Sequence, residues 1–352
     1  MARLWEVAFY ARRTIRYGAM ALVVMIIGRV VLGMAIDLYK KLNPDPPPAP
    51  TVGFSTLPPL KFPKQKRPDI TYKLETISGA VTTPDYQAKI YFMPITRPNL
   101  LGLERGTQVA ASLGFLFEPE ALSERLYRFS RSTPIPARLD FDIVTGNFKM
   151  RVDWFDQPDF LQEKLLPDEK QAITEVRNYL NKADLLANDI EEGNHGITFL
   201  GAKGKSYKVV DSLSEADFVQ IDLFRKPIQE GLPSVTATKG KGIVRVILSG
   251  SRTQNQRAIQ VEYDYFPVDV ESAETYPIKT GDAAWQELIG GGGYIVSSPG
   301  EGEVTVRSAS LAYYDAFDPQ NYFQPVYVFE GDGDFKALVP AVDSSWVQES
   351  VE

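Results

Sequence analysis

The sequence predicts an α+β protein with a single N-terminal transmembrane helix, a Pro-rich stalk and a folded part built from antiparallel sheets, each packed with a short helix. Two observations lead to this fold class. One long apolar stretch lies near the N-terminus, and strand-like segments occur in runs beside a few separate helices, near 106–154, 168–265 and 280–341. Strands in runs favour antiparallel sheets, whereas a doubly wound parallel sheet needs helices and strands in alternation.

The size and composition of the chain narrow its class. The chain has 352 residues, of which 44% are hydrophobic and 24% charged, so most of it should fold around apolar cores. Because a single core stops growing at roughly 250–300 residues, this length favours more than one lobe. The sequence has no cysteine and one histidine. This composition excludes disulfides, thiol nucleophiles, cysteine-ligated zinc and sites that need two imidazoles.

Residues 17–39 are predicted to form the transmembrane helix. Between Gly18 and Ile36 only Arg29 is charged, and this length is close to the roughly 20 residues that cross a bilayer as a helix. Residues 1–16 contain four arginines and one glutamate. Such a basic flank stays in the cytoplasm, so residues 40–352 are expected to lie on the extracytoplasmic side of the cell membrane.

Two features of this segment leave alternatives open. A charge at mid-membrane costs roughly 2.5–3.5 kcal/mol on insertion scales, so Arg29 either pairs with an acidic group in a partner's membrane helix or is tolerated by its apolar surroundings. Gly33-Met34-Ala35 fits a small-residue cleavage site, so a cleaved signal peptide is the rival interpretation. The length of the apolar segment favours a retained anchor.

Residues 40–68 are predicted to form an extended Pro-rich stalk. The segment Asn43–Pro50 alone contains five prolines, a composition typical of polyproline II at about 3.1 Å per residue. Four basic residues between positions 61 and 67 should keep the stalk solvated. Residues 40–352 nevertheless carry a net charge of −10, which is a poor surface for phosphate groups. No nucleic acid partner is therefore expected.

The first folded lobe is expected at 69–161. Apolar and polar residues that alternate with period two predict its strands. The spacing of Val109, Ala110 and Leu113 predicts a helix over 106–113, and Thr145-Gly146-Asn147 favours a hairpin turn between the last two strands. The expected strands cover 70–77, 88–94, 127–130, 137–144 and 148–154.

The second folded lobe is expected at 162–342, followed by a tail at 343–352. It should consist of two helix-plus-sheet modules, 162–275 and 276–342. The same alternation of apolar and polar residues predicts the strands of both modules. These strands cover 196–200, 207–210, 216–224, 243–248, 258–265, 303–313, 325–330 and 335–341.

Two helices should hold these modules together. One starts near Asp168 and carries an apolar stripe as far as Ala183. The other starts at Thr280, a good N-cap residue, and presents Trp285 to the terminal sheet. We expect Trp346, in contrast, to be partly exposed in a polar tail. The apolar residues that face Trp285 are expected to be Leu311, Tyr313, Val326, Val328 and Leu338.

Several residues are candidates for chemistry, and each has a simpler structural explanation. His195 lies in a predicted turn, and the chain has neither a second imidazole nor a thiol to support it. Ser249-Gly250-Ser251 lacks the spacing of a nucleophile elbow. The glycine runs at 239–242 and 290–293 lack the context of a phosphate-binding loop. The acidic clusters, which could hold a cation or act as paired carboxylates, are Asp140/Asp142, Asp217/Asp222 and Glu330/Asp332/Asp334.

The last of these clusters offers only three carboxylates, whereas calcium takes six to eight oxygens, so a Gly/Asp hairpin turn is predicted there. We therefore predict no catalytic residue, no cofactor site and no metal site. The protein is not expected to be an enzyme.

The C-terminal part of the chain resembles a known family. The segments concerned are Leu311–Tyr314, Gln324–Phe329 and Leu338–Val342, with the upstream pattern Tyr276-Pro277-Ile278-Lys279-Thr280-x-x-Ala283-Ala284-Trp285-x-x-Leu288. They are similar to the C-terminal module of YycH/YycI-type proteins. That family consists of single-pass, outward-facing regulators of a cell-wall histidine kinase, with PepSY-like lobes. The resemblance implies a protein partner at the membrane, and more broadly the chain resembles anchored bacterial envelope proteins.

These observations favour a bacterial envelope protein that acts as a protein-binding or regulatory module on a membrane sensor kinase or on wall machinery. The missing catalytic constellation and the aromatic-rich strands fit this interpretation. One alternative is an accessory protein that binds or hydrolyses wall polymers through two carboxylates roughly 5–10 Å apart. Another is a structural component of a secretion or pilus assembly.

Overall fold

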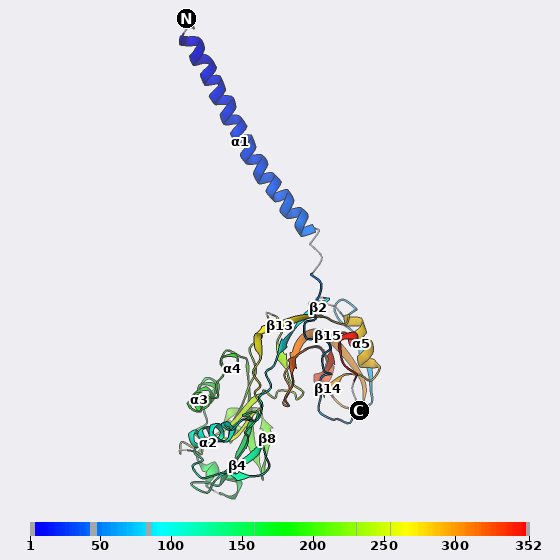
Figure 1. Ribbon diagram of the computed structural model, residues 1–352. Helices are drawn as coiled ribbons and strands as arrows, with labels where there is room; N and C mark the ends of the chain where they lie inside the picture. The colour runs from blue at the N-terminus through cyan, green and yellow to red at the C-terminus, as the bar shows by residue number, and fades with distance from the viewer. Residues whose placement is uncertain are drawn as a thin grey trace. The chain divides into compact units, whose positions relative to one another are not determined.

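The computed structural model describes residues 4–42, 48–81, 86–157, 159–229, 231–253 and 255–349. The chain divides into two compact units, Met1–Ala49 and Pro50–Glu352. The first unit contains helix α1 (Leu4–Leu42), drawn in blue in Figure 1. Its stretch Phe9–Tyr39 is long and apolar enough to cross a membrane, and all of the side chains in that stretch are exposed. The predicted span at 17–39 lies within this helix, whereas residues 43–47 of the predicted stalk lie outside the described residues.

The second unit contains a nine-stranded antiparallel sheet in the order β3-β4-β5-β6-β12-β11-β9-β7-β8. Its central strands alternate apolar and polar residues, because one face packs on helices and the other carries charged side chains. β5 and β6 form the hairpin predicted at Thr145-Gly146-Asn147. The strands are β3 (Glu120–Ala121), β4 (Leu126–Arg131), β5 (Ala137–Asp142), β6 (Phe148–Val152), β7 (His195–Lys203), β8 (Ser206–Val210), β9 (Phe218–Leu223), β11 (Val244–Ser249) and β12 (Ala258–Tyr263).

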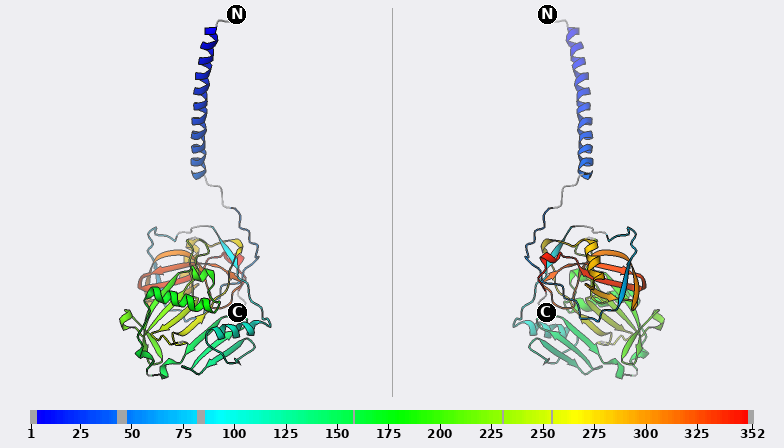
Figure 2. Two further views of the ribbon diagram at one scale, coloured as in Figure 1. Left: turned by 90° about the vertical axis from the view of Figure 1, so that its left-hand side faces the viewer. Right: turned by 90° about the vertical axis from the view of Figure 1, so that its right-hand side faces the viewer.

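Helices α2 (Gly102–Ser112) and α3 (Glu169–Lys182) lie on the same face of this sheet, which the left view of Figure 2 shows from the helix side. α3 begins with a capping box, in which Asp168 accepts from the N–H of Gln171 at 2.9 Å and the Gln171 side chain bonds back to the Asp168 backbone. Buried residues of α3 and of the strands form the largest core between them. The short helix α4 (Asn188–Glu191) follows α3 in the chain.

Two further sheets complete the second unit. A six-stranded sheet has the order β1-β15-β17-β18-β14 with β10 beside β15, and a three-stranded sheet has the order β13-β2-β16. Helix α5 (Gly281–Ile289), capped by Thr280, packs on the six-stranded sheet. The strands are β1 (Ile70–Leu74), β2 (Gln87–Phe92), β10 (Ser234–Val235), β13 (Asp269–Pro277), β14 (Tyr294–Ser297), β15 (Gly302–Tyr314), β16 (Tyr322–Phe323), β17 (Pro325–Gly331) and β18 (Phe335–Pro340).

The predicted α+β class is confirmed, with one difference in strand direction. β1 and β10 run parallel to β15, whereas antiparallel pairing was expected throughout. Both strands reach the sheet after long connections from elsewhere in the chain, which permit parallel pairing. Single turns of 3₁₀ helix lie at Trp154–Asp156, Phe160–Gln162, Leu213–Glu215, Asp332–Asp334 and Ser344–Trp346.

The predicted lobe boundary near residue 161 is wrong. β6, which precedes the boundary, pairs with β12, which lies far beyond it. β1 and β2, from the expected first lobe, pair with β15 and β13. Residues 69–161 and 162–342 therefore do not form separate lobes. Alternation within a strand shows which side chains share a face, but it does not identify the partner strand when that partner is distant in the sequence.

The segment 50–68 packs on the rest of the second unit and is not a free stalk. Leu57 is fully buried and forms a parallel bridge with Val347. The side-chain amide of Gln324 donates to the carbonyl of Pro58 at 3.0 Å. An extended proline-rich segment makes no internal hydrogen bonds, so its carbonyls are available to donors on the folded part. The prediction of a solvated stalk is wrong for these residues.

The C-terminal segment also packs on the folded part. Trp346 is half-buried, as expected, but its ring contacts Tyr276 edge to face with centroids 6.0 Å apart. Asp343 caps the turn Ser344–Trp346, which follows it, by accepting from the backbone N–H of Ser345 at 3.0 Å. Residues 343–349 of the predicted tail therefore contact the rest of the second unit and do not extend freely from it.

Trp285 packs on the terminal sheet as predicted, in the same core as the predicted Leu311, but on the face opposite to the predicted Val326, Val328 and Leu338. The centroid of its ring lies 5.8 Å from that of Phe329 and 6.2 Å from that of Tyr72. Phe329 belongs to the same core as Leu311, whereas Val328 belongs to a separate cluster on the other side of the sheet. Because side chains alternate with period two, choosing the neighbouring residues selects the wrong face for a whole strand.

Arg67, from the expected stalk, caps the C-terminal end of α5. Its Nη1 donates to the carbonyls of Gly291 and Gly292 at 2.7 Å each, and its Nη2 donates to the carbonyl of Leu288 at 2.9 Å. The last carbonyls of a helix have no partner within the helix and carry its partial negative charge, so a guanidinium stabilises them. This contact fixes residue 67 to the six-stranded sheet through α5.

Arg225 joins the nine-stranded sheet to the six-stranded sheet. The side chain follows β9 and is fully buried. Its Nε donates to Asp315, which follows β15, at 3.0 Å, and its Nη2 donates to the carbonyl of Phe266, which follows β12, at 2.7 Å. Its Nη1 pairs with Asp189 on α4. A buried cation is stable only when opposing charges and acceptors surround it in this way.

Replacing Arg67 with Ala should lower the free energy of unfolding by about 1–3 kcal/mol, because the carbonyl of Leu288 in α5 and the carbonyls of Gly291 and Gly292 just beyond it lose a charged donor. The matched control is Lys66→Ala, which removes an exposed neighbouring cation and should change stability by less than about 0.5 kcal/mol. Denaturant unfolding of the full chain in a nonionic detergent measures both variants. Equal and near-zero effects would show that residue 67 belongs to a free stalk.

Candidate functional site

His195 and Ser249, two of the candidates considered from the sequence, lie in surroundings that explain them without a catalytic role. His195 is exposed at the start of β7, where its backbone pairs with Leu223, rather than in the predicted turn. Ser249 is 1% exposed, and its hydroxyl donates to the carbonyl of Gln256 at 2.7 Å, which closes the connection between β11 and β12. This hydroxyl proton is held by a backbone acceptor and not by a general base, unlike that of an activated serine.

Each predicted acidic cluster is neutralised by its own cations and does not converge on one point. The pairs are Asp140–Arg128, Asp142–Arg125, Asp217–Lys164, Asp222–Arg245, Glu330–Lys336, Asp332–Arg307 and Asp334–Lys239. Within the described ranges, no group of three or more histidine, aspartate and glutamate side chains is placed to hold a metal ion.

The polar face of the nine-stranded sheet carries a row of charges of alternating sign. The members lie directly opposite one another on six successive strands, from β4 to β9. We call this row the charge ladder; it consists of Arg128, Asp140, Lys149, Glu262, Arg245 and Asp222. Opposite charges on neighbouring strands stabilise a sheet, so the ladder accounts for most of the charge on this face.

The adjacent row contains a pair of like charges. Arg138 on β5 lies directly opposite Arg151 on β6, and like charges in this position destabilise a sheet. Arg138 reaches Asp153 at 3.4 Å, a long contact, and both side chains of that pair are partly exposed. The Nε of Arg151 is buried without a hydrogen-bond partner in the described part of the chain. The Nη2 of Arg151 donates to the carbonyl of Lys205 at 3.3 Å, so Asp153 is the only carboxylate paired with the two arginines among the described residues, and the pair keeps an excess of positive charge.

The ladder and the like-charge pair border a shallow depression of about 290 Å³. Four cationic side chains and two carboxylates line it, although the chain as a whole has a net charge of −7. The charged lining residues are Arg128, Arg138, Lys149, Arg151, Asp140 and Glu262. We call this surface the basic depression. Its local excess of positive charge favours an anionic partner.

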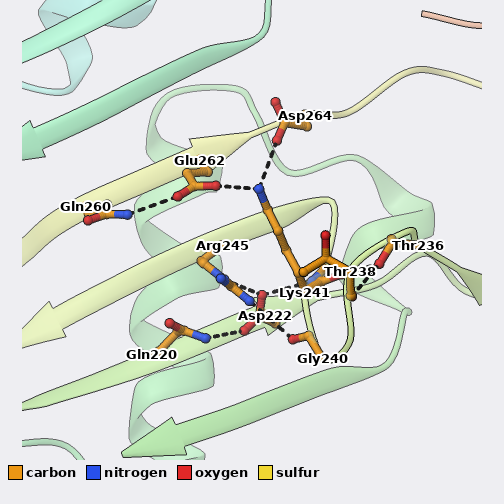
Figure 3. Close-up of polar contacts among 11 residues, drawn as sticks. Gln220, Asp222, Thr236, Thr238, Gly240, Lys241, Arg245, Gln260, Glu262 and Asp264 are labelled. Carbon is orange, nitrogen blue, oxygen red and sulfur yellow. Dashed lines mark hydrogen bonds and ion pairs between the residues drawn. The ribbon is translucent and has the colours of Figure 1, made fainter. Parts of the chain in front are cut away.

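Lys241 lies beside the ladder, where the sheet meets a loop of the neighbouring sheet. Figure 3 shows its ammonium between the carboxylates of Glu262 and Asp264, at 2.5 and 3.8 Å. The same ammonium lies 4.4 Å from the ring centroid of Phe317, which follows β15. Next to them, Asp222 on β9 accepts from Arg245 on β11 at 2.7 Å. The network therefore extends from β9 to the end of β12.

Hydrogen bonds within the loop before β11 hold Lys241 in position. The hydroxyl of Thr236 donates to the carbonyl of Lys241 at 2.7 Å and closes the loop. Gly242 follows, and its N–H donates to Asp222 at 2.9 Å. A Cβ at position 242 would lie 2.3 Å from the carbonyl oxygen of Leu223, so this close approach of two strands requires glycine.

The two carboxyls that share Lys241 titrate differently. Burial acts to raise the pKa of Glu262, but the hydrogen bond and charge of Lys241 outweigh it, and the pKa is lower than usual. Burial raises the pKa of Asp264, and the charges of Lys241 and Lys149 only partly oppose it. Two carboxyls with pKa values moved in opposite directions resemble an acid–base pair. Here, however, the Lys241 ammonium occupies the space between them.

Sequence reasoning missed both the Lys241 network and the basic depression. The alternation in β12 indicates that Gln260 and Glu262 share a face, but Lys241 comes from a glycine-flanked loop whose direction the sequence does not give. The Arg138–Arg151 pair was accessible in principle, because the predicted turn between β5 and β6 sets the register of that hairpin.

Replacing Lys241 with Met should lower the free energy of unfolding by about 2–4 kcal/mol at neutral pH, because Glu262 loses its partner in a half-buried site. The folded-state pKa of Glu262 lies below that of an ordinary glutamate, so its stabilising contribution is present above the unfolded-state pKa and is lost as the pH falls through the folded-state pKa. The difference in the free energy of unfolding between wild type and variant should therefore become smaller in acid. Denaturant unfolding at pH 7 and pH 4 measures it, and a gap that widens in acid would contradict this pairing.

Comparison with known proteins identifies no family for this chain. No family model and no curated protein matches it. Among solved structures, one that matches is an uncharacterized protein from Eubacterium rectale, with 11% sequence identity over 76% of this chain and 86% of the other. Its TM-score is 0.32, which does not establish a common fold. The resemblance to YycH/YycI-type proteins therefore stays a prediction.

Proposed function

We propose that this is a single-pass bacterial envelope protein whose folded part binds an acidic segment of another envelope protein. The observation that carries the proposal is the basic depression, in which Arg138 lies opposite Arg151 without sufficient neutralising charge. A membrane sensor kinase or a component of the wall machinery is the class of partner implied by the C-terminal resemblance. The module would act by binding and not by catalysis.

Membrane attachment rests on α1. Its apolar stretch Phe9–Tyr39 is long enough to span a bilayer, and a cleaved signal sequence is the alternative with the same pattern. Basic residues before the stretch favour a cytoplasmic N-terminus with residues 40–352 outside. Arg29 within the stretch would then either approach the headgroups or pair with an acidic group of a partner's helix.

An extended acidic segment suits the basic depression better than a compact anion. The depression is shallow and lies along strands β4, β5, β6 and β12. It can therefore contact an extended ligand over several strands, but it cannot enclose a compact one. Carboxylates spaced along a chain would neutralise Arg138 and Arg151 while the ladder keeps its own pairs. The charge on the rest of the folded part would repel a polyanion such as nucleic acid.

A second candidate function is hydrolysis of a wall polymer by Glu262 and Asp264. It is favoured by their opposite pKa changes and by their common position at Lys241. The position of the lysine counts against it, because a glycosidic bond must lie between an acid and a base or nucleophile. Binding is therefore the better supported function.

Binding of a synthetic acidic peptide tests the proposal. The full chain in a nonionic detergent is titrated with a fluorescent ten-residue peptide of alternating Glu and Ser, and with a matched peptide that carries Gln for Glu. We expect the acidic peptide to bind at least tenfold more tightly, and Arg138→Gln to weaken it by about three- to tenfold. The same variant should unfold at an equal or slightly higher temperature, because it removes a like-charge contact.

The matched control is Arg105→Gln, which removes an exposed arginine from α2 on the other face of the sheet. It should leave peptide affinity unchanged. Equal affinity for the Glu and Gln peptides, or equal losses in the two variants, would refute docking at the basic depression. Protease treatment of intact cells tests orientation separately, because a C-terminus that stays protected would contradict an extracytoplasmic location.

A further inference from the structure

A second cationic site lies on the helix-covered face of the nine-stranded sheet. In β4, Tyr127, Phe129 and Arg131 share that face, and Phe129 is fully buried in the core. Arg128 points to the other face and belongs to the charge ladder. Arg131 is therefore a charged residue at a position where the alternation of its strand calls for an apolar one.

The guanidinium of Arg131 is buried with little compensation. The residue is 7% exposed. Its Nη2 donates to the carbonyl of Asn255 at 2.9 Å, its Nη1 makes a long contact of 3.4 Å to the carbonyl of Leu113, and its Nε has no hydrogen-bond partner. A guanidinium carries five N–H donors, so most of its capacity is unused. Among the described residues, no carboxylate lies within 4.0 Å of it, in contrast to Arg225.

Arg131 lines a cavity of about 370 Å³ between α2, α3 and the strands. Volumes of this size are typical of sites for small organic molecules. Leu113, Met150 and Leu248 provide an apolar wall. The ring of Phe115 supports the guanidinium from another side, with the Arg131 Cζ 4.9 Å from the ring centroid.

The other charges around the cavity leave it positive. Arg257 is neutralised by Glu175, through contacts of 2.7 and 3.0 Å. Lys182, in the last turn of α3, lines the cavity and forms no ion pair with a carboxylate in the described part of the chain. Burial lowers the pKa of Arg131, and Tyr179 is the titratable group that opposes this. An anion in the cavity would supply the missing partner.

We propose that this cavity binds a small organic carboxylate, with the carboxylate at Arg131 and Lys182 and an apolar group against Leu113, Met150 and Leu248. A guanidinium binds a carboxylate through two parallel N–H contacts, and the apolar wall selects against a bare inorganic ion. The same chemistry is offered by the C-terminal residue of a peptide and by a free carboxylic acid. This site goes beyond the proposed docking function and lies on the opposite face of the sheet.

Calorimetric titration of the full chain in a nonionic detergent tests the proposal with four probes. N-acetylphenylalanine represents a peptide C-terminus, 3-phenylpropionate a free acid, N-acetylphenylalanine amide the neutral isostere, and inorganic phosphate a bare anion. We expect at least one of the two acids to bind at least tenfold more tightly than the amide and the phosphate. Tighter binding of N-acetylphenylalanine indicates a peptide C-terminus, and tighter binding of 3-phenylpropionate indicates a free acid.

Two variants and one control locate the binding. Arg131→Met should weaken binding of the acid at least tenfold and leave binding of the amide unchanged. Lys182→Met, at the rim, should weaken binding of the acid about three- to tenfold. Arg125→Met, an exposed arginine at the entry to β4, should change nothing. Lys182→Met carries the test if Arg131→Met does not fold. The proposal is overturned by acid and amide binding equally, by phosphate alone binding, by unchanged affinity in the variants, or by no binding of either acid at 10 mM.

Discussion

A buried guanidinium determines how the two main sheets meet. Arg225 lies where β9, β12 and β15 end, and its partners Asp315, Asp189 and the carbonyl of Phe266 come from different elements. Burial raises the pKa of Asp315, and the charge of Arg225 opposes that rise. Because a buried charge without its partner is strongly destabilising, each of these elements must be in place before the junction is stable.

The two faces of the nine-stranded sheet differ in their charges and in what covers them. β4 shows the difference within one strand, since Arg128 points to the charge ladder and Arg131 into the helix-covered cavity. The ladder neutralises its own charges, whereas Arg131 and the Arg138–Arg151 pair do not. Sites that leave charge uncompensated lower stability, and each of the two proposed ligands would supply the opposite charge at its site.

Local features of the fold were predictable from the sequence, and long-range ones were not. The caps at Asp168 and Thr280 place α3 and α5 because the cap residue bonds to a neighbouring backbone N–H. The pairing of β6 with β12 depends on residues far apart, so the lobe boundary near 161 was wrong. The polar β13 gave no apolar alternation and was missed. Arg131 was not identified either, because the strand predicted at 127–130 ended one residue before it, whereas β4 extends to Arg131.

A double-mutant cycle between Arg225 and Asp315 tests most directly whether the buried ion pair holds the sheets together. The free energies of unfolding of wild type, Arg225→Met, Asp315→Leu and the double variant are measured in denaturant. We expect each single change to lower the free energy of unfolding by about 3–5 kcal/mol, and the double variant to lose less than the sum of the two by about 1–3 kcal/mol. Additive losses, or single losses below about 1 kcal/mol, would contradict this expectation.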